Sequence, residues 1–441
     1  MFEPETVWTF DAADRVSFSV GAANELGDEL SAFDASSVLF VSDAGVVDAG
    51  IVSYLTDRLP DGIEYGVYGD VEPEADIDVY RDALERARAD SPDVVVGVGG
   101  GSAMDVAKTT GALLEVDEDP LAFVAPPTGE GKPVPRSGRP VVCLPTTAGT
   151  GAETSPVTVI SLPDRETKVG ISSRYQYPDL AVLDPTLSVT LPPEQTASSG
   201  MDALAQAIEA HTVRRYDQKP RADDSVGRPD YGGRTPLTDS LAEQAIKLVS
   251  GNIRRAVGNG EDLEARSGML LGSFLAGLAY TNAGVTVNHA MAMAIGGRLH
   301  SPHGATVAVL LPASMRYNAG ASPDRHARIA TLLADAENGS GTGSKEAADA
   351  VEQLRSELGL PDGLSAFGAT ADDVRSFAER TIQLERLTSN NPRALPVGRR
   401  RHDRAVALTG SVERSRARHT LTHRPSLALL SIGPEHVHEV L

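Results

Sequence analysis

Residues 92–114 read PDVVVGVGGGSAMDVAKTTGALL, and this stretch decides the fold class. A short run of valines is followed by three consecutive glycines and then by residues spaced as in a helix, which predicts a buried strand, a tight turn and a helix. Glycine lets the backbone approach a ligand closely, and the free N–H groups at a helix N-terminus favour an anion. We therefore expect a diphosphate cradle, formed by Gly99, Gly100, Gly101 and Ser102. A plain strand-to-helix turn is the alternative interpretation of the same residues.

Similar apolar runs occur on both sides of this stretch. SSVLFVSD at 36–43 and the weaker IEYGVYGDV at 63–71 precede it, and RPVVCLPTT at 139–147 and VTVISL at 157–162 follow it. Helical patterns alternate with these runs, which is typical of a parallel, doubly wound sheet. The sequence therefore predicts a Rossmann-like α/β domain over residues 1–190.

The pattern changes from about Leu191 onward to long Ala/Leu stretches at helical spacing, with few β-branched runs. Such spacing predicts amphipathic helices. We therefore expect a second, all-helical domain over 191–391, with a polar, Pro/Gly-rich surface loop at 215–236.

The last segment, 392–441, differs from the rest of the chain. After Asn391 there are nine arginines and five histidines against four acidic residues, and no clean amphipathic period is visible. A genuine basic tail could bind an acidic partner. A frameshifted reading of a GC-rich gene, or a disordered segment, would explain the same composition, and we favour the frameshift. The histidines of this tail are therefore poor candidates for metal ligands.

Acidic residues outnumber lysine and arginine by 61 to 40, which gives a formal charge of −21. This charge disfavours nucleic acid and anionic membranes as partners. The chain contains six lysines, and an acid-rich, lysine-poor composition resembles that of cytosolic proteins from halophiles. No run of eighteen apolar residues and no signal-peptide pattern occurs, so we expect a cytoplasmic protein. The single cysteine, Cys143, is expected to be a buried apolar thiol.

Two further segments suit a nucleotide. Asp43 ends a strong predicted strand, where a carboxylate can accept hydrogen bonds from an adenosine ribose and repel a 2′-phosphate. Thr146, Thr147 and Thr150 in LPTTAGTGAETSP offer hydroxyls after another strand. Each segment could instead form an ordinary turn whose side chains bond to the backbone. Together with the glycine stretch, they favour a nucleotide cleft that prefers NAD(H) to NADP(H).

A metal site is predicted from three residues in the second half. His289 and His303 flank a Gly-rich break in NHAMAMAIGGRLHSPHG, and Asp202 lies on a predicted helix with Gln206 one turn further along the same face. One carboxylate and two imidazoles suit Zn²⁺ or Fe²⁺ and can leave a position open for substrate. Taken singly, each residue has a more ordinary reading, as a helix-terminal carboxylate, a helix histidine and a turn residue.

Several motifs, in this order, resemble those of the iron-containing (group III) alcohol dehydrogenases. They are VSD at 41–43, GVGGGSAMDVAK at 97–108, LPTTAGTGAE at 144–153, YPDLAVLDP at 177–185, LPPEQTASSGMDALAQAIEA at 191–210, NHAMAMAIGGRLHSPHGATVAVLLP at 288–312 and NNPR at 390–393. The resemblance covers about Val16 to Arg393 and is nearest to the glycerol and propanediol dehydrogenase branch; with the composition, it points to a halophilic archaeon. It implies an NAD(P)-binding Rossmann-like domain, a helical metal-binding domain and an active site between them.

The resemblance also implies roles for single residues. Asp202, His289 and His303 match the family's metal ligands. Gln206 stands where the iron enzymes usually have a fourth ligand, a histidine, so the ion would be held by three residues and water or by a long fourth contact. Three-ligand zinc sites occur in the glycerol dehydrogenases of the family.

Other matched positions concern protons and the cofactor. Met293 replaces a histidine that is thought to help proton transfer in many members. His300, or else water and a cofactor ribose hydroxyl, would take that role, although a solvent-facing loop histidine is the more ordinary reading of His300. Lys168 in TKVGISS matches a lysine that contacts the cofactor, and Asp105 is expected to contact the diphosphate or ribose.

The expected activity is hydride transfer between NAD(P) and a small alcohol or diol, which gives an aldehyde or ketone, with the metal as Lewis acid. Three alternatives remain open. They are a sugar-phosphate enzyme related to dehydroquinate synthase or glycerol-1-phosphate dehydrogenase, a maleylacetate reductase, and a catalytically silent nucleotide-binding protein. By analogy with the family we expect a homo-oligomer, a dimer or larger.

Overall fold

A six-stranded sheet forms the first half of the protein. The structure is a computed structural model that describes residues 7–218, 231–336 and 344–395. The strand order is β1-β8-β5-β4-β2-β3, and every neighbouring pair is parallel. The strands are β1 (Arg15–Phe18), β2 (Ser37–Val41), β3 (Glu64–Tyr68), β4 (Val94–Gly99), β5 (Val141–Pro145) and β8 (Leu180–Leu183). The parallel sheet predicted from the alternating pattern is therefore confirmed.

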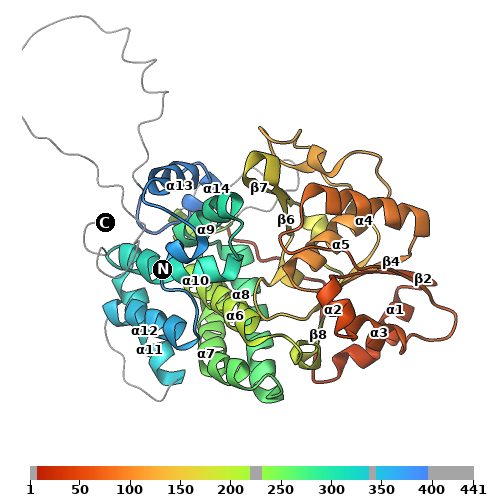
Figure 1. The fold of residues 1–441 in the computed structure, drawn as a ribbon, viewed down its shortest axis with the longest axis horizontal. Helices are drawn as coiled ribbons and strands as arrows, with labels where there is room; N and C mark the ends of the chain where they lie inside the picture. The colour runs from red at the N-terminus through yellow and green to blue at the C-terminus, as the bar shows by residue number, and fades with distance from the viewer. Residues whose placement is uncertain (1–6, 219–230, 337–343, 396–441) are drawn as a thin grey trace, which may run out of the picture.

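Helices cover both faces of this sheet (Figure 1). Side chains alternate along β2, so that Val38 and Phe40 pack in one cluster with α1 and α3, while Leu39 and Val41 pack in another with α4 and α5. Burial on both faces explains the near-continuous apolar strands in the sequence. The helices of this half are α1 (Leu26–Ala32), α2 (Ala44–Asp48), α3 (Ile51–Thr56), α4 (Ile77–Asp90) and α5 (Gly101–Leu113).

The strand order reverses at β2. The chain passes from β2 to β3 on one side, then returns through α4 to β4 on the other side of β2. Ligands of open α/β sheets bind outside the carboxyl ends of the strands at such a switch point. Asp43 follows β2 and Gly99 ends β4, so two of the predicted nucleotide-binding segments meet at this edge.

VTVISL does not join the parallel sheet, contrary to the grouping suggested by its sequence. It forms β6 (Val157–Leu162), which pairs antiparallel with β7 (Thr167–Ser172) in a separate hairpin. Buried and exposed residues alternate along β6, as expected for a strand covered on one face. The hairpin lies between the sheet and the helical half (Figure 1), and Arg380 pairs with Glu166 at its turn, 2.8 Å apart.

Helices alone form the second half within the described residues. They are α6 (Pro193–Thr212), α7 (Pro236–Gly258), α8 (Leu263–Ala283), α9 (Val287–Leu299), α10 (His303–Ala319), α11 (Pro323–Ala336), α12 (Ser344–Glu357), α13 (Asp373–Thr381) and α14 (Glu385–Thr388). Their apolar faces share one large core, centred on α6. The last strand of the sheet, β8, ends at Leu183 and the first helix of this half begins at Pro193, and the domain boundary near residue 190 stays a prediction. The predicted loop at 215–236 lies partly, and the basic tail almost wholly, outside the described residues.

No single helix among the described residues is both long enough and apolar enough to span a membrane. Helices α8 and α9, taken together across a bend of 99°, pass this test by length and composition only.

A buried lysine ties the sheet domain together. The Lys108 ammonium, which is fully buried, donates to the carbonyl oxygens of Ala152, Ser155 and Val157 at 3.0, 3.1 and 2.8 Å. It also lies 2.9 Å from Asp105 Oδ1. Buried charges are tolerated when they are paired and hydrogen-bonded in this way. Lys108 therefore holds the segment after β5 against α5.

We predict that Lys108→Met destabilises the protein. The change keeps the apolar stem but leaves the Asp105 carboxylate and three carbonyl oxygens without their partner, at a cost of about 3–5 kcal/mol. Urea unfolding followed by far-UV circular dichroism measures the loss. The control Lys132→Met removes a lysine from exposed ion pairs, which contribute little to stability, and should unfold at nearly the wild-type urea concentration. Equal stability of the two variants would contradict this role for Lys108.

Candidate metal and nucleotide site

One face of α6 carries three polar side chains that are almost completely buried. Asp202, Gln206 and Glu209 follow each other at helical spacing and expose 2–3% of their surface. The other two predicted ligands come from the next helices of the bundle. His289 lies in the first turn of α9, and His303 is the first residue of α10.

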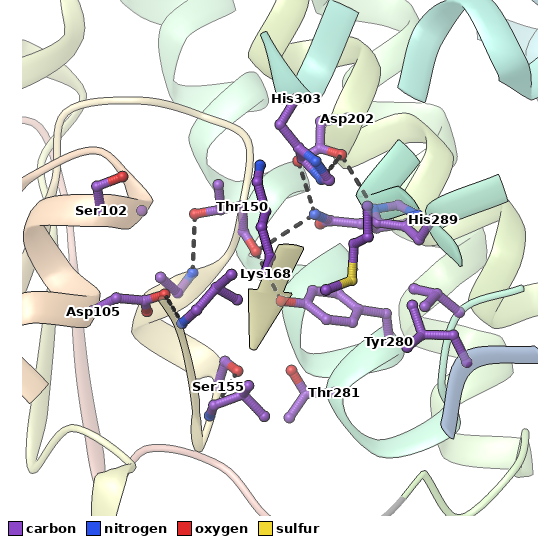
Figure 2. A pocket seen from close by; sticks show the side chains of 18 of the residues that line it. Ser102, Asp105, Thr150, Ser155, Lys168, Asp202, Tyr280, Thr281, His289 and His303 are labelled. Atoms are coloured by element: carbon purple, nitrogen blue, oxygen red, sulfur yellow. Dashed lines mark hydrogen bonds and ion pairs between the residues drawn. The ribbon is translucent and has the colours of Figure 1, made fainter. Parts of the chain in front are cut away.

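The structure brings the predicted ligand trio together (Figure 2). His289 Nε2 lies 3.2 Å from Asp202 Oδ1, and His303 Nε2 lies 3.8 Å from the same oxygen. One ligand atom from each of the three residues lies within 4.8 Å of the others. These distances are short enough for a single ion to contact all three after small adjustments.

Glu209 holds His289 and was not singled out from the sequence. One oxygen of its buried carboxylate accepts from Thr286 N at 2.8 Å, from Thr286 Oγ1 at 2.6 Å and from His289 N at 3.4 Å. The other oxygen bonds to Nδ1 of the His289 ring. A carboxylate on one ring nitrogen fixes the tautomer that leaves Nε2 free to bind a metal. The motif DALAQAIEA contains this signal, because Glu209 lies one further turn along the face of Asp202.

Burial and neighbouring charges shift the pKa values of the two histidines in opposite directions. Burial by itself lowers the pKa of His289, but the carboxylates of Glu209 and Asp202 raise it to about 10. Burial lowers the pKa of His303 to about 4, with the positive charges of Lys168 and His289 adding to the effect. His303 is therefore neutral near pH 7 and offers a lone pair, as a metal ligand must.

Three buried atoms at the cluster lack hydrogen-bond partners among the described residues. They are Asp202 Oδ1, Gln206 Oε1 and His289 Nε2, of which the first and the last form an ion pair at 3.2 Å. Gln206 Nε2 donates to the second Asp202 oxygen at 3.0 Å, which leaves the amide oxygen as the unpartnered atom. Buried polar atoms of this kind call for a ligand that the protein does not itself supply. The donor set fits a divalent ion, with Gln206 as a possible fourth oxygen ligand.

Two of the three glycines in the turn have no room for a side chain. Gly99 has φ +148°, and a Cβ there would lie 2.9 Å from Ala103 Cβ. A Cβ on Gly101 would lie 2.8 Å from Thr150 Cγ2. Gly100 is the N-cap residue of α5. The start of α5 lines two cavities, and the anion cradle predicted there from the glycines stays a prediction.

The remaining nucleotide candidates surround this turn. Asp43 caps α2 by accepting from Val46 N at 3.0 Å, so its turn-forming role is real. It also lines a cavity at the switch point, together with Gly100, Gly101, Ser102, Thr146 and Thr147. A second cavity contains Gly101, Ser102, Asp105, Thr150 and Lys168, together with Asp202, Gln206, His289 and His303. The two cavities share the start of α5.

Glu74 is a second residue that sequence reasoning missed. Lys168 Nζ lies 2.6 Å from Glu74 Oε1, and the Lys168 side chain is 6% exposed. The N–H of Glu74 donates to Ser102 Oγ at 3.0 Å. This pair therefore links the glycine turn to the hairpin strand β7 inside the cavity. Glu74 lies in a polar loop, where nothing in the sequence distinguishes it from the other acidic residues.

Asp105 has partners within the protein. Besides its contact with Lys108, its carboxylate accepts from Val159 N at 2.9 Å. It lines the cavity all the same (Figure 2).

Comparison with known proteins shows the family. A model of the iron-containing alcohol dehydrogenases matches residues 13–185, and a model of the C-terminal part of the same family matches 232–398. The chain belongs to the iron-containing alcohol dehydrogenases. It is an oxidoreductase of a family that uses a divalent metal and NAD(H).

Individual members of the family have different named activities. The chain is 34% identical over 408 residues to a mitochondrial hydroxyacid-oxoacid transhydrogenase of Mus musculus. The matched residues make up 87% of this chain and 86% of the relative. It is 36% identical over 377 residues to long-chain-alcohol dehydrogenase 1 of Geobacillus thermodenitrificans, with 84% and 89% covered. Sulfoacetaldehyde reductase of Bifidobacterium kashiwanohense, solved in complex with NAD⁺, is 29% identical with a TM-score of 0.76, over 88% of this chain and 95% of that one.

Two positions bear on proton transfer in this member of the alcohol dehydrogenase family. Met293 lines the cavity, where a thioether cannot carry a proton. His300 does not reach it. This residue ends α9 in a left-handed conformation with φ 49°, its side chain is exposed, and it lines neither cavity. The candidate role of His300 is therefore not supported by its position.

We predict that Glu209→Gln weakens metal binding. The amide cannot match a carboxylate as acceptor for the ring N–H and the two Thr286 groups, so the affinity for Zn²⁺ or Fe²⁺ should fall by about 10–100-fold. Competition with a chelator measures this affinity directly. Glu194→Gln, at an exposed position in the first turn of the same helix, should leave it unchanged. An unaltered affinity in Glu209→Gln would rule out the positioning role.

Proposed function

We propose that the protein is a metal-dependent, NAD(P)-linked dehydrogenase that interconverts a small alcohol or diol and its aldehyde or ketone. The observation that carries this proposal is one cavity lined both by the start of α5 and by Asp202, His289 and His303. A nicotinamide cofactor held by the glycine turn would extend toward the metal ligands. Such a cavity can place the nicotinamide beside the substrate carbon with which it exchanges hydride, next to the residues that would hold the ion.

The residues have distinct tasks in this reaction. Asp202, His289 and His303 would hold the ion, and Glu209 orients His289. A divalent ion bound there supplies Lewis acidity, which lowers the pKa of an alcohol or polarises a carbonyl. Gln206 would contribute a weak fourth oxygen or leave its place to water. Because Met293 and His300 provide no proton carrier in the cavity, we infer that the proton leaves through water or a cofactor ribose hydroxyl.

The alternatives named from the sequence are not favoured. A sugar-phosphate enzyme needs a cluster of basic side chains to bind phosphate, whereas Lys168 is the only lysine or arginine among the described residues that line the cavity. A maleylacetate reductase works without metal, yet the ligand trio is complete and converges. A catalytically silent protein has no need of unpartnered ligand atoms in a buried cluster.

We predict that metal and activity are lost together in Asp202→Asn. Purified protein should contain about one Fe²⁺ or Zn²⁺ per chain by elemental analysis and should reduce NAD⁺ with a panel of small alcohols and diols. Asp202→Asn should lose the metal and at least about 1,000-fold in kcat/KM, because a neutral amide is a weaker ligand than a carboxylate. NAD⁺ binding should persist in the variant. Bound metal and NAD⁺ without turnover of any alcohol in the wild type would contradict the proposed function.

Asp43 is proposed to favour NAD(H) over NADP(H). We predict that Asp43→Asn raises kcat/KM for NADP⁺ relative to NAD⁺ by about tenfold, equivalent to about 1.4 kcal/mol, because it removes the charge that repels a 2′-phosphate. Asparagine can still cap α2, so the fold should persist. Asp48→Asn, at an exposed position on the same helix, is the matched control. A ratio that stays constant would show that another residue selects the cofactor.

We also propose that the protein acts as a homo-oligomer in the cytoplasm of a halophilic archaeon. The net charge of −21 and the scarcity of lysine support a concentrated electrolyte as its medium. The ligand set suits iron and zinc alike.

A further inference from the structure

The cavity continues beyond the metal ligands to an apolar wall. Its members come from the last turn of α8, the middle of α9, the short helix α14 and two segments outside the helices, and they are Tyr231, Tyr280, Val285, Met293 and Leu387. These side chains pack against one another in one buried cluster. The wall is thus part of the folded core and is already formed before a substrate binds. Figure 2 draws Tyr280 below His289, and both residues line the same cavity, so the wall and the ligand cluster share one space.

Among the described residues, no unpaired cationic side chain lines this end of the cavity to bind a substrate carboxylate. Lys168 is paired with Glu74 at 2.6 Å. The guanidinium of Arg386 stacks on the Tyr231 ring, 4.4 Å from its centre, and Arg386 does not line the cavity. Burial of a carboxylate against apolar side chains without a cation is costly.

The hydroxyl groups at this end can serve an uncharged substrate. Tyr280 Oη donates to the carbonyl oxygen of Thr150 at 2.9 Å. Thr281 Oγ1, in contrast, is buried, lines the cavity and has no hydrogen-bond partner among the described residues. One hydroxyl can bond to an alcohol oxygen, but it cannot neutralise an anion.

We propose that the cavity selects an uncharged alcohol with an apolar carbon chain, which lies against this wall, and rejects hydroxy acids. Relatives of this chain are named for both classes, as hydroxyacid-oxoacid transhydrogenase and as long-chain-alcohol dehydrogenase. The side chains of this member suit the second class. The inference rests on the proposed function, because it concerns the same cavity.

The test compares substrates of equal length with the metal-loaded enzyme and NAD⁺. 1-Hexanol and 6-hydroxyhexanoate differ at the far end of the chain, and kcat/KM for hexanol should be at least about 100-fold higher, a ratio that reflects an unpaired buried charge. 1,6-Hexanediol should stay within about tenfold of hexanol, because its second hydroxyl can bond to Thr281. Equal or better use of 6-hydroxyhexanoate would overturn the proposal.

A positive charge introduced at the wall should reduce the preference for 1-hexanol over 6-hydroxyhexanoate. Met293→Lys and, independently, Leu387→Lys would each place an ammonium at the apolar end. At least one should shift the ratio toward 6-hydroxyhexanoate by about tenfold or more. The size-matched Met293→Leu should keep the wild-type ratio. If both lysine variants are folded and neither shifts it, the wall does not determine specificity.

Equilibrium binding separates this inference from the proposed function. Titration calorimetry of the metal-loaded enzyme should give a lower Kd for hexanol than for 6-hydroxyhexanoate. If no compound in the panel is oxidised but this order of Kd holds, the proposed function fails and the selectivity of the cavity stands. If the alcohols are oxidised but the two Kd values are equal, the selectivity fails and the proposed function stands.

Discussion

The functional site depends on a single buried carboxylate, that of Glu209. One of its oxygens accepts hydrogen bonds from the backbone N–H and the hydroxyl of Thr286 and from the backbone N–H of His289, and the other bonds to the His289 ring. Glu209 therefore joins α6 to the first turn of α9. The N–H groups at a helix start have no partner within the helix. Glu209 satisfies some of them and orients the imidazole with the same side chain. The packing of the bundle and the direction of the ligand are therefore fixed together.

The sheet domain meets this site through close backbone contacts. Gly101 packs against Thr150, so the start of α5 and the segment after β5 lie side by side. Lys108, on α5, holds the same segment by donating hydrogen bonds to three of its carbonyl oxygens. Lys168 and Glu74 then connect the hairpin to the glycine turn. These contacts bring the start of α5 and the metal ligands of the bundle into one cavity, although they belong to different halves of the chain.

Predictions from the sequence succeeded where a residue type, in its local pattern, is typical of only a few structures or sites. Consecutive glycines after a valine run predicted the strand, turn and helix correctly, and the aspartate and histidines of the predicted trio do converge. Predictions failed where tertiary context decides. VTVISL is rich in β-branched residues, yet it pairs in a separate hairpin, with one face buried and the other lining the cavity. His300 follows a helix in polar surroundings, and its chemistry suggested a role that its exposed position at the end of α9 does not support.

The sequence by itself determined the fold class, the family and the candidate ligands, because periodicity, glycine geometry and ligand chemistry are local properties. The tertiary structure alone decided which buried charges neutralise one another. Glu209 pairs with His289 and Glu74 with Lys168. The two pairs join residues 80 and 94 positions apart, and the sequence alone does not distinguish a buried acid or base from an exposed one. Only the folded chain shows that the cavity wall beyond the metal ligands is apolar. The nearby cations do not change this, because Lys168 is paired with Glu74 and Arg386 is stacked on Tyr231.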